Sequence, residues 1–131
     1  MSLAHKFRQH WHMNPIHIDV SQKIVGRAAS GIALLLQGKN KSHFRSHKTD
    51  GQKVVVTNTD KLIFSGRKFA QKTYYRHTGI IGHLRKTNAG DLFRRDSREV
   101  LKRAIRGMLP KNRLLKERMK NLVLHKGEEK R

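Results

Sequence analysis

The chain has 131 residues, of which 30 are lysine or arginine and 9 are aspartate or glutamate, so its formal net charge is +21 with histidine counted as neutral. Cysteine is absent, which excludes disulfides, thiolate zinc sites and cysteine nucleophiles. The apolar runs are much shorter than the roughly 20 residues that a membrane-spanning helix needs. Because this excess of positive charge repels itself in a compact chain, it predicts a polyanionic partner.

The length and the composition predict one domain with a charged segment at each end. Residues 1–14 are basic and rich in histidine, contain no acid, and lack the apolar centre of a secretory signal. We interpret them as a basic N-terminal arm. Residues 15–127 are the expected single domain, and residues 128–131 are a charged C-terminal end.

The first half of the chain predicts a strand, a helix and a second strand. Ile16, Ile18 and Val20 alternate with polar residues, which is the period of a strand with one buried face. Residues 27–37 carry apolar residues at spacings of three and four, typical of a helix, and Gly38 is placed to end it. A polar loop over 39–52 then leads to the β-branched run 53–58, which suits a buried strand.

The second half predicts two more strands, two helices and a last strand. Residues 62–65 and 72–76 are strand candidates. Asp96 and Glu99 have the spacing of a capping box, which begins a helix that Pro110 ends. Arg98, Lys102 and Arg106 form a cationic stripe along that helix. A shorter helix over 112–120 and a strand over 122–124 follow, and together the elements predict one α/β domain.

Two short motifs resemble phosphate-binding or RNA-binding loops, and both interpretations are disfavoured. Gly38-Lys39 is not a P-loop, because Ala33 stands where the earlier glycine is required and Asn40 stands where a hydroxyl residue is required. Gly79-Ile-Ile-Gly82, flanked by Arg76 and Arg85, matches the Gly-x-x-Gly loop of KH domains. That loop joins two helices, whereas the residues before Gly79 indicate a strand.

The histidines suggest a metal site or a nuclease site only weakly. His43 and His47 have the i, i+4 spacing of a metal pair, but the 39–52 loop lacks helical periodicity and no carboxylate completes a site. Those two residues and His77 could supply an acid and a base for phosphodiester cleavage, yet nothing in their spacing supports it. The sequence therefore predicts no metal, no cofactor and no small-molecule substrate, and a protein that is not an enzyme.

Tyr74 to His77 can form part of a nucleic-acid surface. Neighbouring residues of a strand face opposite ways, so one tyrosine is expected in the core and the other outside among cations. RNA is favoured over DNA because no helix-turn-helix or zinc finger is legible and the cations are spread over the whole chain. A surface charged on many faces suits a folded RNA.

Six short segments occur in a fixed order over residues 16–127. They are Val25-Gly-Arg-Ala-Ala-Ser30, Gly38-Lys-Asn-Lys41, His47 with Asp50-Gly51, Ser65-Gly-Arg-Lys68, Lys72-Thr-Tyr-Tyr-Arg-His-Thr-Gly79 with Gly82, and Arg106-Gly-Met-Leu-Pro-Lys111. Together they resemble the ribosomal protein L13 family of the large ribosomal subunit, in its bacterial or organellar form. The sequence departs from the family's usual pattern at Ser46, Gln52 and His83.

The resemblance implies a three-layer α/β/α domain with a small, mostly parallel four-stranded sheet. It implies a structural constituent of the large ribosomal subunit that binds and organises large-subunit rRNA, also during early subunit assembly, beside neighbouring large-subunit ribosomal proteins. The expected location is the ribosome, in a bacterial cytoplasm rather than an organelle, with no membrane partner. The RNA contacts carried over by matching positions are Arg27, Lys39, Lys41, His47, Lys68, Lys72, Tyr75, Arg76, His77 and Lys111.

Two other functions remain open from the residues. The first is a free-standing nucleic-acid-binding or nucleoid-type module, which would have the same charge without a place in the ribosome. The second is a ribonuclease that uses His77, which predicts that the purified protein cleaves RNA.

Overall fold

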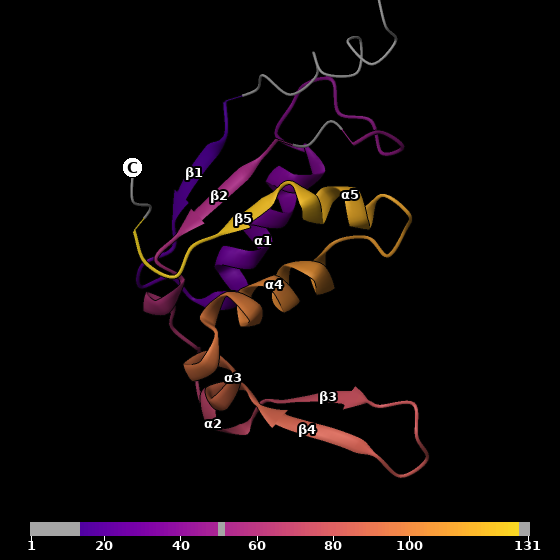
Figure 1. The fold of residues 1–131 in the computed structure, drawn as a ribbon. Coiled ribbons are helices and arrows are strands. Elements are labelled where there is room, and N and C mark those ends of the chain that lie inside the picture. Colours follow the sequence, from indigo (N-terminus) through magenta and orange to yellow (C-terminus); the bar gives the residue numbers. More distant parts are fainter. Residues whose placement is uncertain (1–13, 50–51, 129–131) are drawn as a thin grey trace, which may run out of the picture.

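The computed structural model describes residues 14–49 and 52–128. Nearly all of the expected N-terminal arm and most of the expected C-terminal end therefore lie outside the described residues. The elements, in chain order (Figure 1), are β1 (Ile16–Asp19), α1 (Val25–Gln37), β2 (Val54–Thr57), the 3-10 helix η3 (Thr59–Lys61), α2 (Lys68–Gln71), β3 (Thr73–His77), β4 (Leu84–Asn88), α3 (Ala89–Arg95), α4 (Ser97–Met108), α5 (Leu115–Lys120) and β5 (Leu122–Leu124).

The central sheet is parallel, with the strand order β1-β2-β5 (Figure 1). Ile18 pairs with Val56 in the register of β1 and β2, and Val56 pairs with Leu124 in the register of β2 and β5. Parallel neighbours require long crossover connections. The stretch containing α1 links β1 to β2, and the segment between β2 and β5 contains the other helices. The α/β class predicted from the sequence is confirmed.

The parallel sheet has three strands among the described residues rather than the expected four. The 62–65 segment, expected to be a strand, makes a single parallel bridge between Ile63 and Ile24. Ile24 is the last residue before α1, so the chain turns into a helix directly after this bridge and the pairing does not continue. The remaining strands, β3 and β4, pair with each other in a separate antiparallel sheet.

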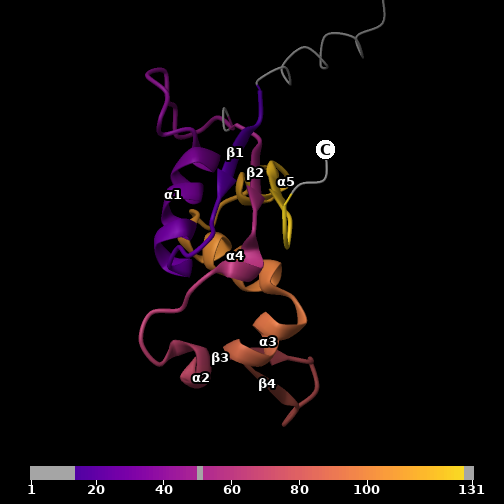
Figure 2. The same ribbon diagram turned by 90° about the vertical axis from the view of Figure 1, so that its left-hand side faces the viewer.

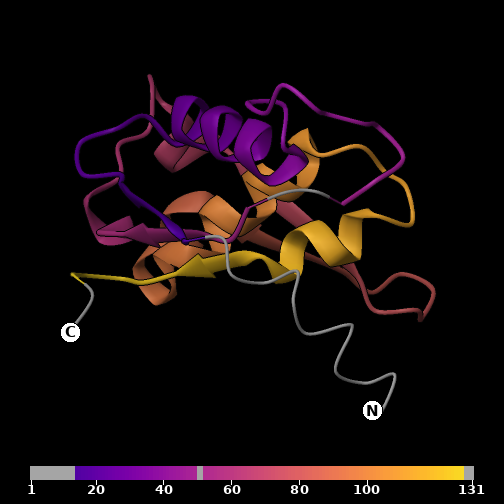
Figure 3. The same ribbon diagram turned by 90° about the horizontal axis from the view of Figure 1, so that it is seen from above.

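The main core lies on one face of the parallel sheet. Ile18, Val54 and Val56 point into the same apolar cluster, and α1 and α4 supply its other side (Figure 3). The helical contribution consists chiefly of Ala29, Ile32, Leu36, Val100, Leu101 and Ile105, each at most 1% exposed. On the opposite face of the sheet, His17 and Asp19 of β1 are exposed, whereas Val55 of β2 is only 4% exposed. Helices α1 and α4 thus cover the face of the sheet that carries Ile18, Val54 and Val56.

Helix α1 begins and ends close to the expected positions. Gly38 follows its last residue with φ of 77°, and its N–H donates to the carbonyl oxygens of Leu34 and Leu35. Glycine adopts this left-handed conformation without a steric penalty, which explains why the helix ends there. No helix in the described part of the chain is long and apolar enough to cross a membrane.

Helix α4 begins at the predicted cap, but without the reciprocal arm of a capping box. The carboxylate of Asp96 accepts from the N–H of Arg98 at 3.1 Å, so the N-cap is confirmed. The N–H of Asp96 donates to the carbonyl oxygen of Leu92, the last turn of α3, and is therefore already satisfied. Glu99 instead accepts from Arg103 at 3.0 Å, one turn further along. The Glu99 side chain therefore does not accept from the N–H of Asp96, as it would in a capping box.

The turn after β1 is organised by Asp19. Its carboxylate accepts from the backbone N–H of Ser21 at 2.9 Å, from the Ser21 hydroxyl at 2.6 Å and from the Asn58 amide at 3.0 Å. These hydrogen bonds, chiefly those from Ser21, lower the pKa of Asp19 from 3.8 to about 2. The charged carboxylate thus holds the end of β1 to the segment that follows β2.

We expect Asp19→Ala to destabilise the protein in a pH-dependent way. Because folding lowers the pKa of Asp19, its contribution is complete above 3.8 and is lost as pH falls through about 2. The difference in unfolding midpoint between wild type and Asp19→Ala, measured in urea, should therefore be constant near neutral pH and shrink below about pH 4. If the difference in unfolding midpoint stays the same over this pH range, the ionised carboxylate of Asp19 does not contribute to stability.

Candidate nucleic-acid interface

The strands β3 and β4 form a two-stranded antiparallel ribbon at the end of the molecule away from the parallel sheet (Figures 1 and 2). We call residues 72–88 the ribbon. Its base is closed by the N–H of Ala89, which donates to the carbonyl oxygen of Lys72 at 2.8 Å. The sequence prediction found β3, but it found neither β4 nor the short flanking helices α2 and α3.

An aromatic cluster fixes the base of the ribbon to the body of the protein. Phe64, Phe69 and Phe93 pack edge to face, with ring centroids 5.4 to 6.2 Å apart. Gly90 in α3 lies so close that a β-carbon there would be 3.0 Å from the backbone oxygen of Phe69. Such edge-to-face packing is favourable for aromatic rings and restricts their movement. The ribbon therefore extends from a packed support.

One face of the ribbon carries an exposed aromatic ring beside a cation. Tyr75 pairs with Lys86 in the strand register, and the ammonium of Lys86 lies 5.9 Å from the centroid of the Tyr75 ring. Tyr75 is 61% exposed, whereas Tyr74 packs against the core cluster. The prediction of one inner and one outer tyrosine is confirmed. Exposed Tyr75 presents an aromatic face on which a base can stack.

The inner tyrosine is held by two cations. The ammonium of Lys72 and the guanidinium of Arg103 lie 5.4 and 5.1 Å from the centroid of the Tyr74 ring. Burial raises the pKa of the Tyr74 hydroxyl, and the charge of Arg103 opposes that shift. The ring therefore stays neutral, and it links the ribbon to α4 through a cation–π contact.

The opposite face of the ribbon places two arginines side by side. Arg76 and Arg85 are directly paired in the register of β3 and β4, and both are exposed. Like charges in this position destabilise a strand pair. The ribbon sequence contains four lysines or arginines, two histidines and no aspartate or glutamate. An external anion between the two guanidinium groups would relieve the repulsion, and a phosphate matches the geometry of the arginine fork.

The loop after α1 presents a second group of cations. Lys39 and His47 are exposed there, and Lys41 is half-buried, with its N–H donating to the carbonyl oxygen of Gly38. Arg118 of α5 is 2% exposed and donates from Nη2 to the carbonyl oxygen of Ser46 at 3.5 Å. The loop is thus tied to the body by a buried side chain, and it lies at the opposite end of the molecule from the ribbon (Figures 1 and 2).

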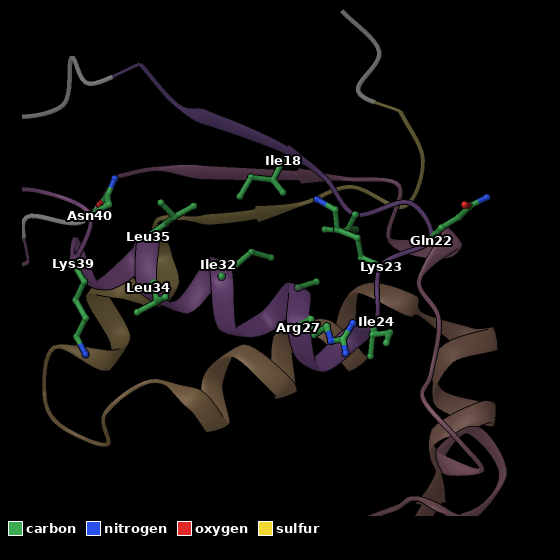
Figure 4. A pocket seen from close by; sticks show the side chains of 13 residues that line it. Ile18, Gln22, Lys23, Ile24, Arg27, Ile32, Leu34, Leu35, Lys39 and Asn40 are labelled. Carbon is green, nitrogen blue, oxygen red and sulfur yellow. The ribbon is translucent and has the colours of Figure 1, made fainter.

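An apolar groove runs along α1 beside β1, and lysine and arginine side chains also line it (Figure 4). Its volume is about 790 Å³, and Ile18, Ile32 and Leu35 contribute to its apolar lining. Arg27 lines it near the start of α1 and Lys39 lines it beyond the end of the helix. Two residues predicted from separate motifs are therefore brought to one surface feature.

The ten predicted RNA contacts fall into separate groups. Lys68, Lys72, Tyr75, Arg76 and His77 come together on α2 and the ribbon. The members near α1 are Arg27, Lys39, Lys41 and His47, and exposed Lys111 lies between α4 and α5. The sequence-based candidates did not include Arg85 and Lys86, which also lie on the ribbon. Arg85 was visible as a flank of the Gly79–Gly82 motif, but only the strand pairing shows that it lies opposite Arg76.

The arrangement also bears on the alternatives raised by single motifs. Gly79 and Gly82 lie between two strands, which rules out the helix–loop–helix setting of a KH loop. His77 lies in the ribbon while His43 and His47 lie in the loop at the other end, so these three residues do not form a joint acid–base site. No group of three potential metal-ligating side chains is found within the described ranges.

A small α/β protein with a cationic ribbon and a second cationic loop has the charge distribution that is typical of basic nucleic-acid-binding proteins. Comparison with known proteins identifies the family. The model of the family described as "Ribosomal protein L13" matches residues 12–131, so the chain belongs to the ribosomal protein L13 family.

Curated relatives agree with this assignment. A protein of Desulfotalea psychrophila named "Large ribosomal subunit protein uL13" is 42% identical over 110 residues, which cover 84% of this chain and 78% of the relative. The protein of the same name from Thermobifida fusca is 38% identical over 122 residues, covering 93% and 79%. These relatives are named as ribosomal proteins and not as enzymes, which confirms the prediction that the chain is not an enzyme.

Proposed function

We propose that this protein is a structural constituent of the large ribosomal subunit that binds and organises large-subunit rRNA, including during early subunit assembly. Its membership of the L13 family supports this, because the matched relatives carry that subunit in their names. The ribbon, which contains no acid and sets two arginines opposite each other, carries the argument for RNA. Neighbouring large-subunit proteins are the expected protein partners.

The ten residues predicted from the sequence, together with Arg85 and Lys86, are the proposed RNA contacts. They lie on the ribbon, on the loop after α1, on α1 itself and beyond α4, so a folded RNA would contact several sides of the protein. The cations would displace counterions from the phosphates, while the packed α/β body would fix the relative positions of the RNA segments. Because the matched relatives are bacterial proteins, a bacterial cytoplasmic ribosome is the proposed location.

The salt dependence of RNA binding tests the proposal. Seven of the ten sequence-predicted contacts are lysine or arginine. If they contact phosphates, affinity for large-subunit rRNA should fall by about 10³- to 10⁵-fold between 50 and 200 mM salt. Filter binding with a bulk tRNA competitor measures this affinity and its preference for rRNA. Binding that is indifferent to salt, or equal for tRNA and rRNA, would contradict the proposal, and cleavage of the RNA would indicate a nuclease instead.

A further inference from the structure

The tip of the ribbon, residues 78–83, has a fixed conformation. Gly79 and Gly82 have φ of 88° and 80°, which glycine adopts readily. The N–H of His83 donates to the carbonyl oxygen of Ile80 at 3.2 Å, and with Gly82 in the third position this is the pattern of a type II turn. The hydroxyl of Thr78 donates to the carbonyl oxygen of His83 at 3.1 Å and closes the loop.

The imidazole of His77 adds a further restraint at the start of the tip. Its Nδ1 accepts from the N–H of Gly79 at 3.0 Å. The backbone on both sides of Ile80 and Ile81 is therefore held by hydrogen bonds. The backbone of this turn is therefore ordered before any partner binds, which lowers the entropic cost of binding.

This ordered tip exposes apolar side chains. Ile81 is 98% exposed and Ile80 is 63% exposed, and Leu84 beside them is 50% exposed. A single exposed apolar residue needs no explanation, but several together at a projecting end mark an interaction site. At 98% exposure, Ile81 is covered by neither strand of the ribbon. The tip therefore presents an apolar point on a rigid support.

The surroundings of this apolar tip favour RNA over a protein pocket. Arg76 and Arg85 form the second residue pair from the tip, after His77 and Leu84, and the ribbon has no acidic residue. An apolar protein pocket does not require two arginines close to the side chain that enters it. An RNA offers both chemistries at adjacent positions, since phosphates bind the arginines and the faces of unstacked bases are apolar.

We propose that the tip inserts Ile81 against the face of a nucleobase in large-subunit rRNA, at a step that is partly unstacked, while Arg76 and Arg85 bind the flanking phosphates. Isoleucine acts as such a wedge in proteins that kink nucleic-acid duplexes. This inference rests on the proposed function, because it specifies how the ribbon engages the RNA.

The apolar contribution of Ile81 and the ionic contribution of Arg85 differ in their dependence on salt. Two single variants of the full-length chain, Ile81→Ser and Arg85→Gln, test them in binding to large-subunit rRNA. We expect Ile81→Ser to weaken binding by about 10- to 100-fold at every salt concentration, because burial of an isoleucine side chain releases no counterion. Arg85→Gln should lower the slope of log affinity against log salt by nearly one. Ile63→Ser, at a 48% exposed isoleucine outside the ribbon, is the matched control and should bind as wild type does.

The outcomes distinguish this inference from the proposed function. If binding by wild type is indifferent to salt, or is equally strong for tRNA and rRNA, the proposed function itself fails. If wild type and Arg85→Gln behave as expected but Ile81→Ser stays within about twofold of wild type, only the wedge is wrong.

A photocrosslinking amino acid at position 81 provides a second readout in purified large subunits. Crosslinks from position 81 to rRNA bases support the wedge. Crosslinks to a ribosomal protein instead would overturn it and identify an apolar protein pocket as the partner of the tip.

Discussion

Replacing Lys72, Arg76, Arg85 and Lys86 together by glutamine should largely abolish the contribution of the ribbon to RNA binding. Each true phosphate contact adds about 0.7 to 0.9 to the slope of log affinity against log salt, so the slope should decrease by about three. We expect affinity to fall by more than about 100-fold at low salt and by less as salt rises, since screening already weakens these contacts. Filter binding across a salt series measures both quantities.

A matched variant shows whether the loss of binding comes from the position of the removed charges or from the lower net charge of the protein. Lys53, Arg113, Lys116 and Lys120 are exposed and lie outside the ribbon and outside the proposed contacts. Their replacement by glutamine removes the same charge of four, so a general field effect would give the same loss of binding. The account predicts a clearly smaller change in slope for this variant. Equal slopes for the two variants would show that the ribbon is not a preferred site, and circular dichroism confirms that both are folded.

Ile105→Ala should cost about 2 to 5 kcal/mol of unfolding free energy. Ile105 is 0% exposed and lies on the side of α4 that packs on α1 and the sheet. Its truncation removes apolar contacts and leaves a cavity that this small core can fill only by moving α4 against α1. Urea denaturation should show a lower midpoint with an unchanged dependence on urea concentration.

The loss of unfolding free energy should depend on the size of the cavity that the substitution leaves. Two further variants test this dependence. Ile105→Val removes one methylene group and should cost only about 0.5 to 1.5 kcal/mol. Lys102→Ala changes an exposed residue of the same helix and should stay within about 0.5 kcal/mol of wild type. A loss below about 1 kcal/mol for Ile105→Ala would mean that α4 does not pack on the sheet as described.

The elements predicted well from the sequence are those with a strong local pattern. The alternation around Ile18 predicted β1, the apolar spacing before Gly38 predicted α1, and Asp96 predicted the start of α4. In each case a buried face or a satisfied terminal N–H group depends on residues that are close together in the chain. Such elements can be predicted from the sequence without knowing which residues pack against them.

The elements missed depend on partners that are distant in the sequence. β4 has the sequence Leu-Arg-Lys-Thr-Asn and no apolar alternation, so only its pairing with β3 makes it a strand. The opposite error occurred at Ile63, where an apolar segment expected to be a strand makes only one bridge, with Ile24. Met108, the last residue of α4, is 44% exposed, whereas Leu109 directly after it is buried.

The candidate site was predicted in part for the same reason. Charge density alone indicated a polyanion, and the motif around Tyr75 indicated the first strand of the ribbon. The opposition of Arg76 and Arg85 depends on strand register, which sequence spacing alone did not reveal. The resemblance to the L13 family was needed to choose ribosomal RNA among nucleic acids, and the family match supports that choice.

Sedimentation of a tagged chain expressed in a bacterium, followed by crosslink mapping of its RNA, tests the central claim most directly. We expect the chain to remain with large subunits through a high-salt wash and to crosslink to large-subunit rRNA through the ribbon. Recovery of the chain at the top of the gradient, with complete large subunits that lack it, would contradict the account.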